Sequence, residues 1–156
     1  MTDSGAEMAK PFVAATINVL STMAQINPTP GVPYVKKDNM ATGDVSAIIG
    51  FSGSKSGSIS VSFEKQCAKA MVVNMLGDDV EDLEQDMKDA VGEISNMISG
   101  QARTGLTELG LTFQGSTPTV VMGDNHTITH ITDSSIVVIP FTSDQGNFTV
   151  EFCLDS

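Results

Sequence analysis

A doubled order of helical and strand-like patterns limits what this chain can fold into. Apolar residues recur at helical spacing over 10–25, 64–77 and about 80–110. Apolar runs predict three strands after the first helix and three more after the last, at about 32–37, 44–52, 57–63, 112–122, 126–139 and 147–154. Because each element must bury an apolar face, this order predicts an α/β domain in which helices pack on a mixed β-sheet.

Two of the predicted helices also resemble each other in sequence. "VAATINVLS" in the first and "VGEISNMIS" in the last share Val, Asn and Ser at matching places. Together with the repeated element order, this match predicts an internal duplication of the form α-βββ-α-α-βββ. In the alignment Asn18 lies opposite Asn96, whereas Ala15 lies opposite Glu93. The first half therefore lacks an acidic residue at the place where the second half has one.

The length and charge of the chain bound its domain organisation and its partners. At 156 residues it fits one domain over 1–156, in which we expect residues 1–8 to be a flexible N-terminus. A chain of this size buries enough surface to fold without a metal or a disulfide. The formal net charge of −11 argues against nucleic acid and anionic membranes as partners, because both would need a basic face. A protein or a small molecule is the expected partner.

The cysteines and the N-terminal residues indicate a cytoplasmic protein. Cys67 and Cys153 lie far apart in apolar surroundings, so buried thiols in a reducing compartment are favoured over a disulfide. The opening "MTDSGAEMAK" carries acidic residues where a secretion signal needs basic ones and an apolar run. No apolar run reaches the ~18 residues of a membrane span. We therefore expect a cytoplasmic location without membrane insertion.

One face of the last predicted helix carries residues that helix formation does not favour. Within "DAVGEISNMISGQ", a helical wheel places Asp89, Glu93, Asn96 and Gly100 along one line. Asn and Gly are poor helix formers, and Ser99 beside them reduces the bulk further. A solvated face is the plain interpretation, but small and amide side chains favour a surface that a partner approaches closely. The opposite, apolar stripe consists of Leu83, Met87, Ala90, Val91, Ile94, Ile98 and Ala102.

These outward residues resemble the signature of a known family. Asp89, three residues, Glu93, two residues, Asn96, twenty-one residues and Pro118 is similar to the pattern of the CheC, CheX and FliY phosphatases of bacterial chemotaxis. The match holds at all four positions, and the element order covers nearly the whole chain. With one intact site, the chain resembles CheX more than CheC, and we expect no extra motor-binding domain of the FliY kind. The resemblance implies a single-domain CheC-like fold.

The resemblance also implies an activity. It is hydrolysis of the aspartyl phosphate on a receiver-domain response regulator, CheY, whose phosphorylation sets the bias of the flagellar motor. Asn96 is then expected to orient the attacking water, and Glu93 to dock the helix on the receiver's lysine. Asp89 would either belong to the partner-binding surface or only orient the helix. Gly100 would belong to the partner-binding surface, and Pro118 would fix strand geometry. Magnesium would come with the receiver, so no cofactor of the chain itself is expected. CheX-like proteins are homodimers, which implies a homodimer here.

Two other functions stay open from the sequence. One is a noncatalytic adaptor that binds a receiver or a motor component, and the other is a phosphatase of a different response regulator. The amide of Asn96 counts against a pure adaptor, because binding alone does not need it. The identity of the receiver depends on surface complementarity, which one partner's sequence does not reveal.

A metal site and a phosphate-binding loop are not expected. His126 and His130 are four residues apart, but "NHTITHIT" alternates as a strand does, which separates them by ~13 Å. "GFSGSKSG" is rich in Gly and Ser, yet it lacks the Gly-Lys-Ser ending of a phosphate-binding loop. It predicts a hairpin instead.

Overall fold

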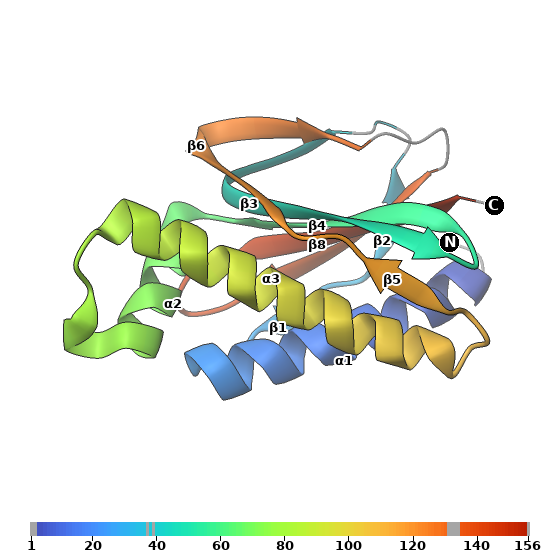
Figure 1. Cartoon of the computed structure of the whole chain (residues 1–156), viewed down its shortest axis with the longest axis horizontal. Coiled ribbons are helices and arrows are strands. Elements are labelled where there is room, and N and C mark those ends of the chain that lie inside the picture. Colours follow the sequence, from blue (N-terminus) through green and yellow to red (C-terminus); the bar gives the residue numbers. More distant parts are fainter. Residues whose placement is uncertain (1–2, 37, 39, 131–134, 156) are drawn as a thin grey trace.

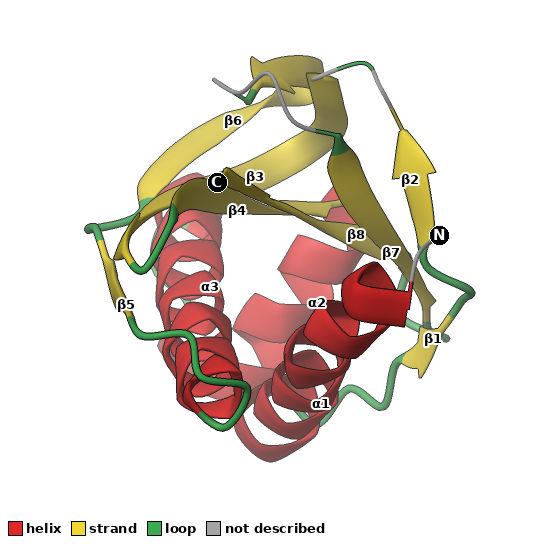
Figure 2. Ribbon diagram, turned by 90° about the vertical axis from the view of Figure 1, so that its right-hand side faces the viewer, coloured by secondary structure: helices red, strands yellow, loops and turns green. Residues whose placement is uncertain are grey.

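One eight-stranded sheet carries the helices on a single face, as Figures 1 and 2 show. The structure is a computed structural model that describes residues 3–36, 38, 40–130 and 135–155. The helices are α1 (Asp3–Ala24), α2 (Lys65–Leu76), the short 3-10 helix η1 (Gly77–Asp79) and α3 (Leu83–Thr107). The strands are β1 (Thr29–Pro30), β2 (Tyr34–Lys36), β3 (Met40–Gly53), β4 (Ser56–Phe63), β5 (Phe113–Gly115), β6 (Thr119–Thr129), β7 (Ile136–Thr142) and β8 (Phe148–Asp155). No helix within these described ranges is long and apolar enough to cross a membrane.

The sheet has the strand order β1-β7-β8-β4-β3-β5, with β2 also paired to β7 and β6 to β3. The α/β architecture with helices packed on one sheet is as predicted. Every described pairing is antiparallel, however, whereas we expected a mixed sheet. The strands follow one another in runs and do not alternate with helices. Short connections join β3 to β4 and β7 to β8, and a short connection favours an antiparallel pair.

The pairing pattern is the same when the two halves of the chain are exchanged. In the first half β3 pairs with β4, while β5 and β6 of the second half pair with β3. Correspondingly, β7 pairs with β8, while β1 and β2 of the first half pair with β7. The pairing of β4 with β8 joins the halves at the centre. This exchange symmetry supports the predicted internal duplication.

The first helix begins earlier than we predicted. α1 starts at Asp3 rather than near residue 10, which places Pro11 inside the helix and not in its first turn. Proline removes a backbone donor from a helix, but packing compensates here. Phe12 is fully buried, and a Cβ added to Gly105 of α3 would come within 2.8 Å of the Pro11 Cβ. Tertiary contacts rather than local propensity therefore decide where this helix starts.

Among the described residues, each half of the chain contains four strands where we expected three. β1 is the additional strand of the first half. The predicted strand 112–122 is split into β5 and β6. β6 then continues past residue 122, through Asn125 with a φ of 52°. The predicted strand 126–139 includes residues 131–134, which lie outside the described residues. In the first half, the predicted hairpin is confirmed as the connection between β3 and β4.

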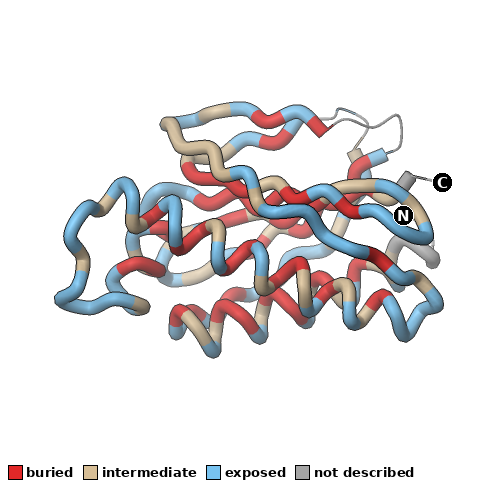
Figure 3. The backbone as a smooth tube through the Cα atoms, in the orientation of Figure 1, coloured by how far each residue is buried: buried red, intermediate tan, exposed pale blue. Residues whose placement is uncertain are grey.

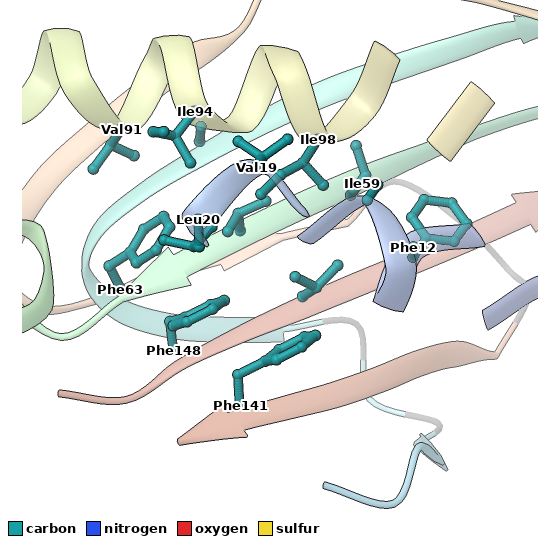
Figure 4. Packing of buried hydrophobic residues seen from close by; sticks show 14 of the residues in the cluster. Phe12, Val19, Leu20, Ile59, Phe63, Val91, Ile94, Ile98, Phe141 and Phe148 are labelled. Carbon is teal, nitrogen blue, oxygen red and sulfur yellow. The ribbon is translucent and has the colours of Figure 1, made fainter. Parts of the chain in front are cut away.

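Buried residues lie on both the sheet and the helices (Figure 3). Aromatic and aliphatic side chains pack between these elements (Figure 4). Phe12 of α1 stacks on Phe152 of β8 with ring centroids 4.1 Å apart. The apolar stripe of α3 faces this core as predicted, and all its members are buried except Leu83, which is half-buried. Cys67 and Cys153 are buried free cysteines, which confirms that they are buried and not joined by a disulfide.

Candidate functional site

The outer face of α3 presents the residues that the helical wheel places there. Asp89, Glu93 and Asn96 are exposed, and Gly100 is half-buried. Ser99, which we expected to reduce the bulk of this face, is instead fully buried. A helix turns by ~100° per residue, so the side chain next to Gly100 already faces the core.

An open groove of about 450 Å³ between α3 and β6 brings together residues that are distant in the sequence. Asp89, Glu93 and Asn96 line it from α3, and Pro118 lines it from the segment before β6. Gly100 lies one helical turn beyond Asn96 and is not part of the groove lining. The remaining lining residues are Lys88, Gly92, Met97 and Val120.

Glu93 and Asn96 are both available to a partner. Neither side chain makes a hydrogen bond or an ion pair within the described part of the chain. Asp89 differs, because its Oδ1 accepts a hydrogen bond from Gln85 Nε2 at 2.9 Å. The acid and the amide are three residues apart, or ~4.5 Å along the helix axis. One partner surface can therefore contact both side chains at once.

Local packing accounts for Gly92 of α3 but not for Gly100. A Cβ added to Gly92 would lie 3.2 Å from Val120 Cγ2, so Gly92 lets β6 approach the helix closely. A Cβ added to Gly100 would meet only Arg103 Nη2 at 3.8 Å, which is an ordinary contact. No contact within the described ranges requires a glycine at position 100. We did not single out Gly92 or Val120 from the sequence, although a glycine in a helix interior is a signal for close approach.

Comparison with known proteins identifies the family of this chain. The model of the family described as "Chemotaxis phosphatase CheX" matches residues 45–142. The chain belongs to the CheX family. CheX from Desulfovibrio desulfuricans is 66% identical, with a TM-score of 0.92 over 96% of this chain and 99% of that one. CheX from Vibrio vulnificus is 43% identical, with a TM-score of 0.88 over 96% and 99%.

A more distant structure and a sequence comparison complete this picture. The CheX-CheY-BeF3-Mg+2 complex from Borrelia burgdorferi contains a chain 24% identical to this one, with a TM-score of 0.74 over 96% of this chain and 98% of that one. At that identity the likeness shows a shared fold. A search of curated protein sequences found no match. The predicted resemblance to CheX and the predicted CheC-like fold are therefore confirmed.

The first half of this CheX-family chain uses its corresponding residues differently. Ala15 is buried with 4% of its surface exposed, so the place opposite Glu93 faces the core. Asn18 is exposed, but its Nδ2 donates a hydrogen bond to Gln101 Oε1 of α3 at 2.9 Å. The amide that corresponds to Asn96 thus links α1 to α3.

The histidines of the CheX-family chain have separate surroundings. His126 lies within β6, where Nδ1 is 2.8 Å from Gly123 O and Nε2 is 2.7 Å from Ser46 Oγ. A carbonyl oxygen only accepts, so Nδ1 donates a hydrogen bond to Gly123 O. Among the described residues, no group of three His, Cys, Asp or Glu side chains is arranged to hold a metal ion.

A second polar cluster lies on the sheet face opposite the helices. Ser58 and Ser60 alternate there with core-facing residues of β4, and Glu151 and Cys153 do the same on β8. His130 follows β6 and is fully buried against them. Its Nδ1 lies 3.0 Å from Ser58 Oγ, and its Nε2 lies 3.1 Å from Ser60 Oγ. None of these residues lines the groove between α3 and β6.

This second cluster holds charge inside the protein. Burial alone would lower the pKa of His130, but its contacts with Cys153 and Glu151 outweigh burial and raise the pKa to about 9. His130 is therefore protonated at neutral pH. The Glu151 carboxylate also receives Lys36 Nζ at 3.0 Å, which connects β8 to β2. We interpret the cluster as a structural ion-pair network.

Proposed function

We propose that the chain hydrolyses the aspartyl phosphate of a CheY-like receiver domain, with Asn96 orienting the attacking water and Glu93 docking the helix. The observation that carries this proposal is the exposed pair on α3, whose acid and amide lie one turn apart without partners among the described residues. The family to which the chain belongs is one of chemotaxis phosphatases. The CheX of Borrelia burgdorferi occurs in a complex with CheY, BeF3 and Mg+2, and this supports a receiver as the partner here.

The chemistry of an amide suits this reaction. Phosphoryl transfer passes through a loose, in-line transition state, so positioning and charge stabilisation contribute more than covalent chemistry does. Asn96 can accept a hydrogen bond from the attacking water and donate one to the phosphoryl group. It adds no negative charge beside an anionic centre. A water held behind phosphorus in this way is ready for attack without a general base.

Glu93 has a different role in the proposal. A carboxylate beside a phosphoryl dianion is repelled, and a loose transition state gains little from early deprotonation of the water. A salt bridge from Glu93 to a lysine of the receiver instead holds α3 against the phosphorylation site. Asn96, one turn further along, then enters that site. The magnesium ion is that of the receiver, and the chain's own residues act on the water and on the docking.

The remaining predicted residues frame this pair. Asp89 lines the groove, and its carboxylate accepts a hydrogen bond from Gln85. Asp89 therefore extends the docking surface beside Glu93. Gly100 leaves room for the partner beyond Asn96, since the chain itself has space there for a side chain. Pro118 lines the opposite wall and ends the segment that leads into β6.

The experiment that tests the proposal compares two asparagines. Phosphate release from magnesium-loaded, phosphorylated CheY is measured with wild type, Asn96→Ala and Asn18→Ala. We expect wild type to accelerate release, Asn96→Ala to lose at least about 100-fold in kcat, and Asn18→Ala to keep the activity. Full activity of Asn96→Ala would overturn the role of the amide. Binding by wild type without hydrolysis would favour the adaptor, or a receiver other than CheY, over this proposal.

We also propose that two copies of the chain associate through the edge of the sheet formed by β2, in the cytoplasm. Among the described strands, β2 pairs with β7 and with no other. Exposed apolar side chains gather on and beside it, namely Val32 at 84%, Tyr34 at 50%, Val35 at 43% and Met40 at 50%. An unpaired apolar edge is a ready surface for joining two sheets. Light scattering of wild type and of Val35→Lys would show a dimer that the charge dissociates; a wild-type monomer would refute the proposal.

A further inference from the structure

The groove between α3 and β6 has one polar side and one apolar side. Lys88, Asp89 and Glu93 contribute its charges from α3. The wall opposite α3 is apolar, because Pro118 and Val120 line it. On α3 itself Met97 is apolar and Gly92 has no side chain. The proposed water-positioning amide of Asn96 therefore lines a groove whose opposite wall is apolar.

The groove is built into the packing of the helix on the sheet. Met97 and Val120 are half-buried and pack partly against the core, so only one side of each is left to line the groove. Gly92 forms the floor, where a Cβ would press on Val120 Cγ2 at 3.2 Å. A glycine inside a helix costs ~1 kcal/mol relative to alanine. The chain keeps this glycine at the place where a side chain would both crowd β6 and fill the groove.

The net charge of the chain indicates which kind of side chain the groove binds. With a net charge of −11, the chain repels the negative charge of a phosphorylated site over long range. An attraction that does not depend on charge is then needed next to Asn96, and burial of apolar surface supplies one. A volume of about 450 Å³ is enough for a large side chain. A charged side chain on the apolar side would lose its hydration without a partner.

We infer that this groove receives an apolar side chain that projects from the receiver beside its phosphorylated aspartate, and that Met97 and Val120 bind this side chain and so help to dock the receiver. The inference rests on the proposed function, since Glu93 and Asn96 line the same groove. Once the apolar side chain is seated, α3 is held on both sides of the amide: by the Glu93 salt bridge and by the apolar contact. The groove thereby selects receivers that carry an apolar residue at that place.

The test uses binding as well as turnover, so that the two proposals fail separately. The Kd for CheY loaded with magnesium and beryllofluoride is measured by titration for wild type, Met97→Ala, Val120→Ala and Val121→Ala. Val121 is the matched control, because it is the neighbouring valine of β6, is equally half-buried and does not line the groove. We expect about a three- to tenfold higher Kd for Met97→Ala and Val120→Ala, and an unchanged Kd for Val121→Ala.

Turnover measurements then separate failure of the groove inference from failure of the proposed phosphatase activity. We expect the two groove variants to raise KM for phosphorylated CheY by the same factor with kcat within about twofold of wild type. Circular dichroism confirms that each variant is folded. If wild type binds and hydrolyses while both groove variants match it, the groove inference is overturned and the phosphatase stands. If the groove variants bind more weakly but wild type does not hydrolyse, the groove stands and the phosphatase falls. A wild type that does not bind the loaded receiver overturns both.

Discussion

His130 Nε2 lies 3.4 Å from Glu151 Oε1 inside the protein, on the sheet face that the helices do not cover. The acid is also paired with Lys36, so two cations share one buried carboxylate. Removing one partner of such a pair leaves a charge without compensation. The network therefore makes the stability of the fold depend on the protonation of His130.

We predict that the chain loses stability as the pH rises from about 6.5 to 9. The pKa of His130 is about 9 in the folded state against an ordinary value of 6.5. Below pH 6.5 His130 is protonated in both the folded and the unfolded state, and its full contribution to the unfolding free energy is present. Above pH 6.5 the unfolded state loses the proton while the folded state keeps it, so this contribution declines. Up to about 3 kcal/mol of unfolding free energy is lost by the time the pH passes the folded-state pKa. Urea denaturation at several pH values between 6 and 9 measures this decline.

His126→Gln provides the control for this pH dependence. It removes the other histidine of the chain, whose ring contacts Gly123 O and Ser46 Oγ. The decline should persist in His126→Gln and should be much smaller in His130→Gln. An equal decline in both variants would assign the pH dependence to other groups.

A second prediction concerns Asp44, which ties β3 to two other elements. Its carboxylate accepts the backbone N–H of Asn125 in β6 and of Lys65 at the start of α2, both at 2.9 Å. These hydrogen bonds lower the pKa of Asp44 below its usual 3.8. The contribution of the ionised Asp44 carboxylate to the unfolding free energy is thus present above pH 3.8 and is lost as the pH falls through its lower folded-state pKa. We expect Asp44→Ala to cost about 1–3 kcal/mol of unfolding free energy at pH 7, measured in urea. Asp124→Ala, at an exposed neighbouring site, should change it by less than about 0.5 kcal/mol.

The placement of the site residues could be predicted because it depends on one helix. The spacing of Asp89, Glu93 and Asn96 requires only helical geometry, and a long apolar stripe fixed which way the helix faces. Ser99 was placed wrongly by the helical wheel. It precedes Gly100 by one residue, and the ~100° turn between them directs its side chain into the core. The start of α1 could not be predicted, because Pro11 is typical of a first turn and only its packing on Gly105 explains its place inside the helix.

The groove could not be predicted, because it depends on strand pairing between distant segments. Pro118 was expected to fix strand geometry, but nothing in the sequence shows that β6 pairs with β3 and passes beside α3. The antiparallel sheet escaped prediction for the same reason. Val120 reaches Gly92 only through this topology. Local patterns therefore predict the helix face, and tertiary contacts supply the opposite wall of the site.

A third prediction tests whether Gly100 serves the partner rather than the fold. The chain has room for a Cβ there, so Gly100→Ala should raise the unfolding free energy by about 0.5–1 kcal/mol. Gly100→Leu should bind phosphorylated CheY less well, because its bulk meets the partner beyond Asn96. Thr107→Leu is the control, since Thr107 is exposed on the same line of α3, two turns further on. If Gly100→Leu and wild type have equal KM values, the small residue has no role in docking.

The last prediction separates docking from base catalysis at Glu93. If Glu93 forms a salt bridge to the receiver, Glu93→Gln keeps the shape of the side chain but loses the charge. The KM for phosphorylated CheY should then rise about tenfold while kcat stays within about twofold of wild type. The dependence of KM on salt concentration should also become weaker, because one attractive charge pair has been removed. A general base would behave differently: kcat would fall by about 100-fold or more with an unchanged KM. Asp89→Gln is the matched control, because Asp89 lines the same groove but is already held by Gln85, so its KM should change less than that of Glu93→Gln.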